Sequence, residues 1–136
     1  FLKPEDLGET VDLVTLDLSF ISLELVLPAV RNLMNPGGAV VALVKPQFEA
    51  GPARVGRGGV VRDPEVHRDV LLGLLRRVGA LGFTLFGLTF TPVRGPAGNI
   101  EFLAGFRRNG GELLSDLEER ISRVVKEAWT AFESPS

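Results

Sequence analysis

Apolar and polar residues follow two periods along this 136-residue chain, a pattern that predicts strands separated by helices. The clearest strand is Ala39–Lys45, where six apolar residues run without interruption, as in strands covered on both faces. Pro46 cannot continue the hydrogen-bond ladder and holds Lys45 extended, so the strand is expected to end there. Three further strands are predicted, over Val11–Leu18, Phe83–Thr91 and Ile100–Phe106.

Helical spacing of apolar residues predicts three helices: Leu23–Met34, Pro64 to about Ala80, and an amphipathic segment over 112–133. In the first helix Ser22 is the expected N-cap, and Pro28 predicts a kink or a late start. Asn35-Pro36-Gly37-Gly38 is expected to end it. The last helix fits either docking on a sheet face, which we expect, or a coiled-coil seam.

The order of these elements predicts one α/β domain. The first three strands are joined by helical crossovers and should run parallel. The break over residues 92–99 is short, so the fourth strand is expected to pair antiparallel with the third. The sequence therefore predicts three parallel strands plus one antiparallel strand, with flanking helices.

Composition excludes several kinds of site. The chain has no cysteine, which rules out disulfides and thiolate metal sites, and its single histidine argues against a zinc site built on imidazoles. We interpret that histidine, His67, as a surface or packing residue near the start of the second helix. No apolar stretch approaches the roughly 20 residues that cross a bilayer. Because the chain opens at Phe1 rather than methionine, we expect a piece of a longer cytoplasmic protein.

A net charge of −2 conceals an uneven distribution. Residues 1–50 carry a net charge of −4, residues 51–111 carry +5 from nine arginines and four acids, and residues 112–136 carry −3. An arginine-rich middle segment suits contact with a polyanion. A solvated basic surface explains the same pattern, and the sequence leaves both readings open.

Three charged residues are expected to meet at one edge of the sheet. Asp17 ends the first strand, Lys45 ends the second, and Glu101 is the second residue of the antiparallel fourth strand. The carboxyl ends of the parallel strands and the start of the fourth strand share that edge, where open α/β sheets bind ligands. Without a cysteine or histidine nucleophile, the trio suits a lysine that helps deprotonate a bound hydroxyl while the carboxylates orient it.

Four motifs in this order resemble the hemolysin A (TlyA) family of FtsJ-like ribosomal RNA 2′-O-methyltransferases. They are Val-Asp-Leu-Val-Thr-Leu-Asp-Leu-Ser-Phe-Ile-Ser-Leu at 11–23, Leu-Val-Lys-Pro-Gln-Phe-Glu at 43–49, Gly-Gly-Val-Val-Arg-Asp-Pro at 58–64 and Gly-Pro-Ala-Gly-Asn-Ile-Glu-Phe-Leu at 95–103. The resemblance extends to about Arg107. It implies the second half of a Rossmann-like S-adenosylmethionine-dependent methyltransferase fold, roughly strands four to seven.

The resemblance also implies roles for individual residues. That family carries a Lys-Asp-Lys-Glu tetrad, and Asp17, Lys45 and Glu101 match its second, third and fourth members. The first lysine, the glycine-rich cofactor loop and the S4-type RNA-binding domain have no counterpart in this sequence. A partial cofactor site is implied at Asp17, Leu18, Ser19 and Phe20. The intact protein is thus expected to be an S-adenosylmethionine-dependent enzyme, and this piece alone to be inactive.

The implied partner is ribosomal RNA or a ribosomal subunit rather than a membrane. Arg54, Arg57, Arg62 and Arg94 are then the candidates for phosphate contacts. The first strand is expected to have an open edge, so a homodimer through that edge or through the last helix is an option. The alternative function is a non-catalytic half-Rossmann module that binds RNA or protein.

Overall fold

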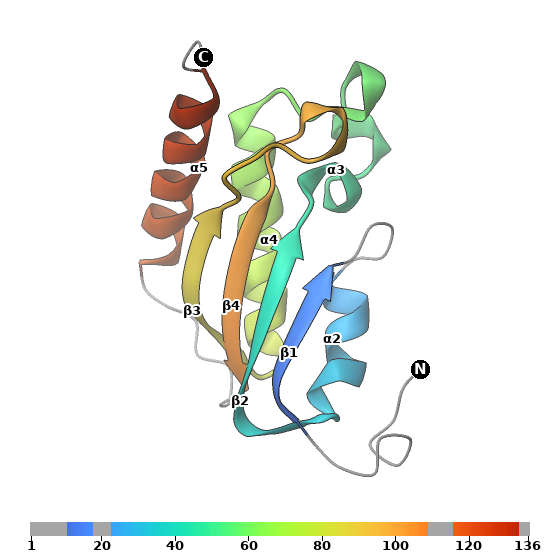
Figure 1. Ribbon diagram of the computed structural model, residues 1–136, viewed down its shortest axis with the longest axis vertical. Coiled ribbons are helices and arrows are strands. Elements are labelled where there is room, and N and C mark those ends of the chain that lie inside the picture. Colours follow the sequence, from blue (N-terminus) through green and yellow to red (C-terminus); the bar gives the residue numbers. More distant parts are fainter. Residues whose placement is uncertain (1–10, 18–22, 109–115, 134–136) are drawn as a thin grey trace.

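A twisted sheet lies in front of a layer of helices in the computed structural model, which describes residues 11–17, 23–108 and 116–133 (Figure 1). The strands are β1 (Val11–Asp17), β2 (Met34–Val44), β3 (Phe83–Phe90) and β4 (Phe102–Arg108). The helices are α2 (Leu23–Arg31), the short α3 (Pro46–Glu49), α4 (Pro64–Ala80) and α5 (Leu117–Glu133). Three single 3₁₀ turns lie in the loops: η1 (Pro52–Arg54), η2 (Arg57–Gly59) and η3 (Pro96–Gly98).

The strand order in the sheet is β1-β2-β4-β3. β1 and β2 pair in parallel, and β4 pairs antiparallel with both β2 and β3. β4 therefore lies between two strands that share one direction, and β1, β2 and β3 all point toward the same edge. This arrangement confirms the predicted fold of three parallel strands plus one antiparallel strand.

The core lies between one sheet face and the helices. Alternate residues of the two central strands are buried: Val40, Ala42 and Val44 of β2, and Phe102, Ala104 and Phe106 of β4. They meet buried residues of α2, α4 and α5, such as Leu27, Leu71 and Val125. α5 contacts α4 and β3, which confirms docking against the domain rather than a coiled-coil seam.

α4 begins as the sequence predicts. Asp63 is its N-cap, with a side-chain oxygen that accepts from the Glu65 backbone nitrogen at 2.9 Å, and Pro64 follows in the first turn. A cap of this type satisfies a backbone donor that the helix itself leaves unpaired. α4 extends to Ala80, at the predicted end.

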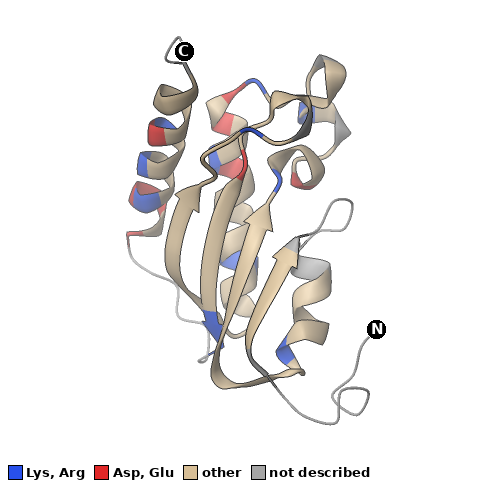
Figure 2. Cartoon of the chain, viewed as in Figure 1, with Lys and Arg blue, Asp and Glu red and all other residues tan. Residues whose placement is uncertain are grey.

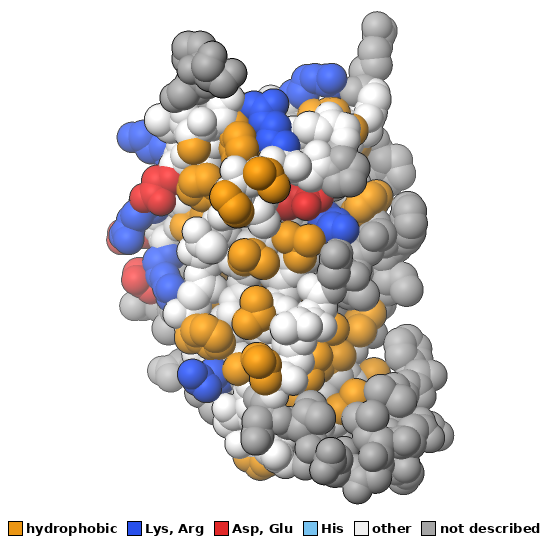
Figure 3. All heavy atoms as spheres, viewed as in Figure 1, with side chains coloured by type: hydrophobic (Ala, Val, Ile, Leu, Met, Phe, Trp, Pro, Cys, Tyr) orange, Lys and Arg blue, Asp and Glu red, His pale blue; other side chains and the backbone are white. Residues whose placement is uncertain are grey.

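The opposite sheet face carries no helix among the described residues. Hydrophobic side chains run down that face in Figure 3, and its most exposed large ones on the strands include Leu13 at 60% and Phe86 at 48%. Phe86 is an extra residue between the register pairs of β3 and β4, and its ring lies over Gly105. β1 pairs only with β2 in the described part of the chain, so the predicted open edge is present.

Two expected boundaries around residues 31–39 were wrong. α2 ends at Arg31 instead of Met34, and β2 begins at Met34 instead of Ala39. The reason is a register irregularity: Met34 pairs with Val11, but the next regular pair joins Ala39 to Leu13. The intervening Asn-Pro-Gly-Gly bulges out of the ladder, and Gly37 adopts a φ of 79°, which favours glycine. Pro28 lies inside α2.

Smaller differences occur near the site. β4 begins at Phe102, so Glu101 lies just before the strand rather than second within it. A short helix, α3, follows Lys45 directly, and the sequence pattern did not reveal it. α5 begins at Leu117, and the expected cap Ser22 and the predicted start of the last helix, 112–115, lie outside the described residues.

Candidate active site

Lys45 lies at the junction between β2 and α3. The strand ends at Val44, and Lys45 is the N-cap residue of α3, with extended backbone angles φ −112° and ψ 95°. Pro46 fills the first helical position, where its missing N–H is not needed. The lysine is half-buried, and its carbonyl accepts from the Phe48 nitrogen at 2.9 Å. The proline predicted to end the strand therefore also starts the helix that fixes Lys45.

Lys45 and Glu101 flank the same register pair. Val44 pairs with Phe102 across the antiparallel strands, so Lys45 follows that pair on one strand and Glu101 precedes it on the other. Residues at opposed antiparallel positions have Cβ atoms about 4.5–5.5 Å apart. The main chain thus brings the two predicted site residues to one point of the sheet edge.

Glu101 is buried, with only 5% of its surface exposed, and it is held from several directions. Gln47 Nε2 of α3 donates to Glu101 Oε2 at 2.9 Å. The Glu101 carbonyl accepts from the Thr91 nitrogen at 2.9 Å. Gly95 packs so closely that a β-carbon there would lie 2.4 Å from the Glu101 carboxyl carbon. A carboxylate held this firmly has one orientation, as a site residue needs.

Gln47 was not identified from the sequence as a site residue. It belongs to the Leu43–Glu49 motif, and its position two residues after Lys45 was the available signal. Only α3 turns the Gln47 amide back toward Glu101, and that helix was not predicted.

Asp17 ends β1, where its backbone pairs with Leu43, two residues before Lys45. The main chain of all three predicted site residues therefore reaches the same edge. The Asp17 side chain, and Leu18, Ser19 and Phe20 as a whole, lie outside the described residues. Their predicted part in a cofactor site stays a prediction.

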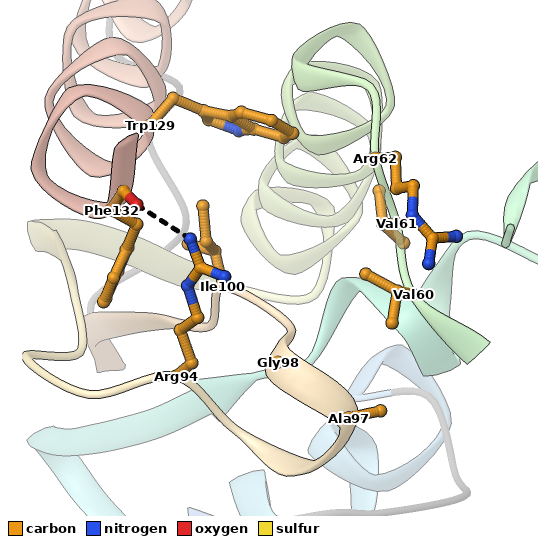
Figure 4. A pocket seen from close by; sticks show the side chains of 9 residues that line it. All are labelled: Val60, Val61, Arg62, Arg94, Ala97, Gly98, Ile100, Trp129 and Phe132. Atoms are coloured by element: carbon orange, nitrogen blue, oxygen red, sulfur yellow. Dashed lines mark hydrogen bonds between the residues drawn. The ribbon is translucent and has the colours of Figure 1, made fainter. Parts of the chain in front are cut away.

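The four arginines predicted to contact RNA differ in their surroundings. Charged residues in general lie mostly outside the strands, as Figure 2 shows. Arg62 and Arg94 line one cavity of about 450 Å³ together with Trp129 and Phe132 (Figure 4). Arg54 instead forms an ion pair with Asp69 at 2.9 Å. The side chain of Arg57 lies outside the described residues.

Asn99 joins the two loops that carry Arg62 and Arg94. Its side chain is buried; Oδ1 accepts from the Val61 nitrogen and Nδ2 donates to the Gly59 carbonyl, both at 2.9 Å. One side chain therefore satisfies two backbone groups of the other loop. The third and fourth sequence motifs are in direct contact through this residue.

His67 is a packing residue, as one of the two sequence interpretations expected. It is fully buried, its ring meets Phe102 edge to face at a centroid distance of 5.4 Å, and Nδ1 accepts from Trp129 Nε1 at 2.8 Å. Burial lowers the pKa of His67 from 6.5 to about 4, and the nearby Asp63 carboxylate opposes this shift. The side chain is neutral at pH 7 and does not line the sheet edge.

No group of three or more potential metal ligands occurs among the described residues. In the same part of the chain, no helix combines the length and the apolar character needed to cross a membrane.

Open α/β sheets bind ligands at the carboxyl ends of their parallel strands. A lysine and a buried carboxylate lie at that edge here, as in a ligand-binding or catalytic domain of the α/β class. The chain belongs to the FtsJ-like methyltransferase family, whose sequence profile matches residues 2–108. This finding confirms the family resemblance inferred from the four motifs.

Individual relatives agree with that assignment. The chain is 50% identical over 122 residues to the candidate rRNA methyltransferase YqxC of Bacillus subtilis, covering 86% of this chain and 42% of that protein. It is 43% identical over 128 residues to the 16S/23S rRNA (cytidine-2′-O)-methyltransferase TlyA of Mycobacterium tuberculosis, covering 93% and 48%. The solved structure of a candidate hemolysin from Streptococcus thermophilus superimposes with a TM-score of 0.84 at 37% identity, covering 98% and 50%. The chain thus spans less than half the length of the curated relatives named here.

Proposed function

We propose that this chain is the carboxyl-terminal half of the catalytic domain of an S-adenosylmethionine-dependent ribosomal RNA 2′-O-methyltransferase. The observation that carries the proposal is the Val44–Phe102 register pair, which sets Lys45 opposite Glu101 at the carboxyl edge of the sheet. The M. tuberculosis relative, named as an rRNA (cytidine-2′-O)-methyltransferase, supports this substrate. RNA of that kind lies in the cytoplasm, where we expect the protein to act.

Lys45 is proposed to take the proton from the ribose 2′-hydroxyl as the methyl group is transferred. A lysine amine at hydrogen-bond distance from a hydroxyl both orients it and accepts its proton. Glu101 is proposed to orient Lys45, because its carboxylate is fixed by Gln47 and by the close approach of Gly95. Asp17 is proposed as the second orienting carboxylate.

The cofactor is proposed to bind over the carboxyl end of β1. The last residue of β1, Asp17, pairs with Leu43, so a ligand over the carboxyl end of β1 would lie beside Lys45. S-adenosylmethionine, when bound, supplies a methyl group on a positively charged sulfur. We propose that Asp17, Leu18, Ser19 and Phe20 form part of that site. The isolated chain is expected to bind the cofactor weakly and to turn over little or nothing.

RNA phosphates are proposed to contact Arg57, Arg62 and Arg94, with a smaller contribution from Arg54. Arg54 is already paired with Asp69, so its net charge toward RNA is reduced. Binding through arginines should weaken as salt rises because counterions are released from the phosphates. The homodimer considered from the sequence gains no support from the described residues or the relatives and stays a prediction.

The test measures methyl transfer from S-adenosylmethionine to ribosomal RNA by the full-length protein that contains this chain. Lys45→Ala is expected to lower the rate by about 10²–10⁴-fold, the usual contribution of a general base. Lys126→Ala removes the same side chain from an exposed position on α5 and should leave the rate unchanged. Retained methylation in the Lys45 variant would contradict the assignment and favour the non-catalytic module, which predicts salt-dependent RNA binding without cofactor.

A further inference from the structure

We propose that the cavity between α5 and the loops at residues 60–62 and 94–98 binds a nucleotide of the RNA substrate other than the one that is methylated. This inference rests on the proposed function and adds a second subsite to it. The cavity measures about 450 Å³, within the range of about 300–1,000 Å³ typical of small-molecule sites. It lies apart from Lys45, which does not line it.

The walls combine aromatic rings with guanidinium groups. Trp129 and Phe132 come from α5 and Arg94 from the loop at 94–98, and these three side chains border one space in Figure 4. Arg62 lines the cavity from the other loop, with its guanidinium group directed away from those three. The remaining lining residues are small or apolar, and none of the nine described residues that line the cavity is acidic. Such a lining suits a planar, negatively charged group.

The Trp129 and Arg94 side chains are held in place before any ligand binds. The Trp129 indole is fixed by its 2.8 Å hydrogen bond to the buried His67. Arg94 Nη2 donates to the Phe132 carbonyl at 2.8 Å, and the Arg94 guanidinium carbon lies 5.1 Å from the centre of the Phe132 ring. Because these side chains are already ordered, a ligand would lose less entropy on binding.

A nucleotide satisfies this lining better than a simple anion or an acidic peptide does. Its base can stack on the Trp129 face and its phosphate can pair with Arg62 or Arg94, as in single-stranded nucleic-acid sites. A simple anion or a carboxylate side chain would use the guanidinium groups and leave the Trp129 face without a partner, whereas the Phe132 ring is already covered by Arg94. The Trp129 ring therefore favours RNA.

The cavity is also positioned beside the proposed catalytic edge. Ile100 lines the cavity, whereas the next residue, Glu101, faces Gln47. The two sites are thus on opposite sides of one backbone segment. A nucleotide bound in the cavity would belong to the same RNA strand as the hydroxyl held near Lys45.

The test uses a mixed-sequence single-stranded RNA of about twelve nucleotides, a length that exceeds the smallest single-strand binding sites. Its binding to the chain is measured by anisotropy at two salt concentrations. Arg94→Ala and, as a second variant, Arg62→Ala should each bind about five- to tenfold more weakly and lower the salt slope by about 1. Arg123→Ala removes the same charge from an exposed position on α5 outside the cavity and should change affinity less than twofold.

Stacking is read separately from the fluorescence of Trp129, the single tryptophan of the chain. Unlabelled RNA should quench it at saturation, whereas polyglutamate should not. The proposal is overturned if the wild-type chain does not bind RNA, if Arg94→Ala and Arg62→Ala behave like Arg123→Ala, or if saturating RNA leaves the Trp129 emission unchanged. An equal effect of polyglutamate would also overturn it, in favour of an acidic peptide. Methyl transfer by the Lys45 variant tests the proposed function separately, because every protein compared in these binding measurements keeps Lys45.

Discussion

Acidification should destabilise the folded chain through His67. The imidazole is fully buried, and Nδ1 accepts from Trp129, so the neutral ring carries its proton on Nε2. That nitrogen is buried and finds no hydrogen-bond partner among the described residues. Protonating the ring would place a charge in this environment and remove the acceptor of the Trp129 bond.

The sign and the size of the effect follow from the two pKa values. The pKa is about 4 in the folded chain and 6.5 without the fold. Above pH 6.5 both states are neutral and His67 has no effect on the pH dependence. As pH falls from 6.5 toward 4, the unfolded state binds a proton that the folded state excludes, so the free energy of unfolding decreases. The full loss is about 3 kcal/mol, since each pKa unit corresponds to about 1.4 kcal/mol.

His67→Asn is the matched variant. The asparagine oxygen can replace Nδ1 as the acceptor for Trp129, but the side chain does not titrate. Urea unfolding followed by far-UV circular dichroism at about pH 7 and about pH 4 gives the free energy of unfolding of both proteins. Between about pH 7 and about pH 4, the free energy of unfolding should fall by about 3 kcal/mol more for the wild-type chain than for the variant. The carboxylates that also titrate in this range are common to both proteins, so their contribution cancels in the comparison.

The reasoning fails if the two proteins lose equal stability on acidification. An independent check is available because the chain has one histidine, so its ring resonance in a proton NMR titration needs no assignment. A midpoint near 6.5 in the folded chain would show that the ring is accessible to protons and would refute the argument.

Two further substitutions test the contacts that hold Glu101 and the two loops in place. Gly95→Ala should destabilise the chain by about 1–3 kcal/mol in urea unfolding, because its methyl group would lie 2.4 Å from the Glu101 carboxyl carbon. The control, Gly73→Ala, adds a methyl group in open space inside α4 and should stabilise the chain by up to about 1 kcal/mol; equal effects of the two substitutions would refute the argument from close approach. Asn99→Ala should lower the free energy of unfolding by about 2–4 kcal/mol and speed hydrogen exchange of the Val61 amide, because it removes the acceptor of that amide. Asn32→Ala, at an exposed position, should do neither. Unchanged exchange at Val61 would contradict the role of Asn99.

The fold was predictable where hydrophobic period and local chemistry agree. The Asp63-Pro64 cap identified the start of α4, and Pro46 identified the end of β2. The prediction failed at Met34, which was expected to be the last residue of a helix because Asn-Pro-Gly-Gly follows it. Met34 instead pairs with Val11 and begins β2. Such a long-range contact cannot be seen in the local sequence pattern.

The placement of the candidate site residues was predictable to a different depth for each. That Lys45 and Glu101 reach one edge of the sheet could be inferred because strand ends are visible in the sequence and strand direction follows from the connections. Gln47 and Asn99 could not, because Gln47 acts through one hydrogen bond across 54 residues of sequence and Asn99 through two, across 38 and 40 residues. Trp129 could not be inferred either, since nothing in the local sequence indicates that it lines a cavity.

At the candidate site, the backbone determines which residues lie close together and side-chain contacts determine how they are oriented. The proximity of Lys45 and Glu101 is a property of the β2–β4 register, so it should survive any substitution that leaves the ladder intact. The orientation of Glu101 depends on Gln47 and Gly95, which lie in loops and a short helix outside the ladder. Substitution of Gln47 should therefore lower the proposed activity of the full-length protein with little loss of stability, whereas Gly95→Ala should lower both. Substitutions in the ladder itself, at Val44 or Phe102, should reduce both together, because these residues belong to the core as well as to the register.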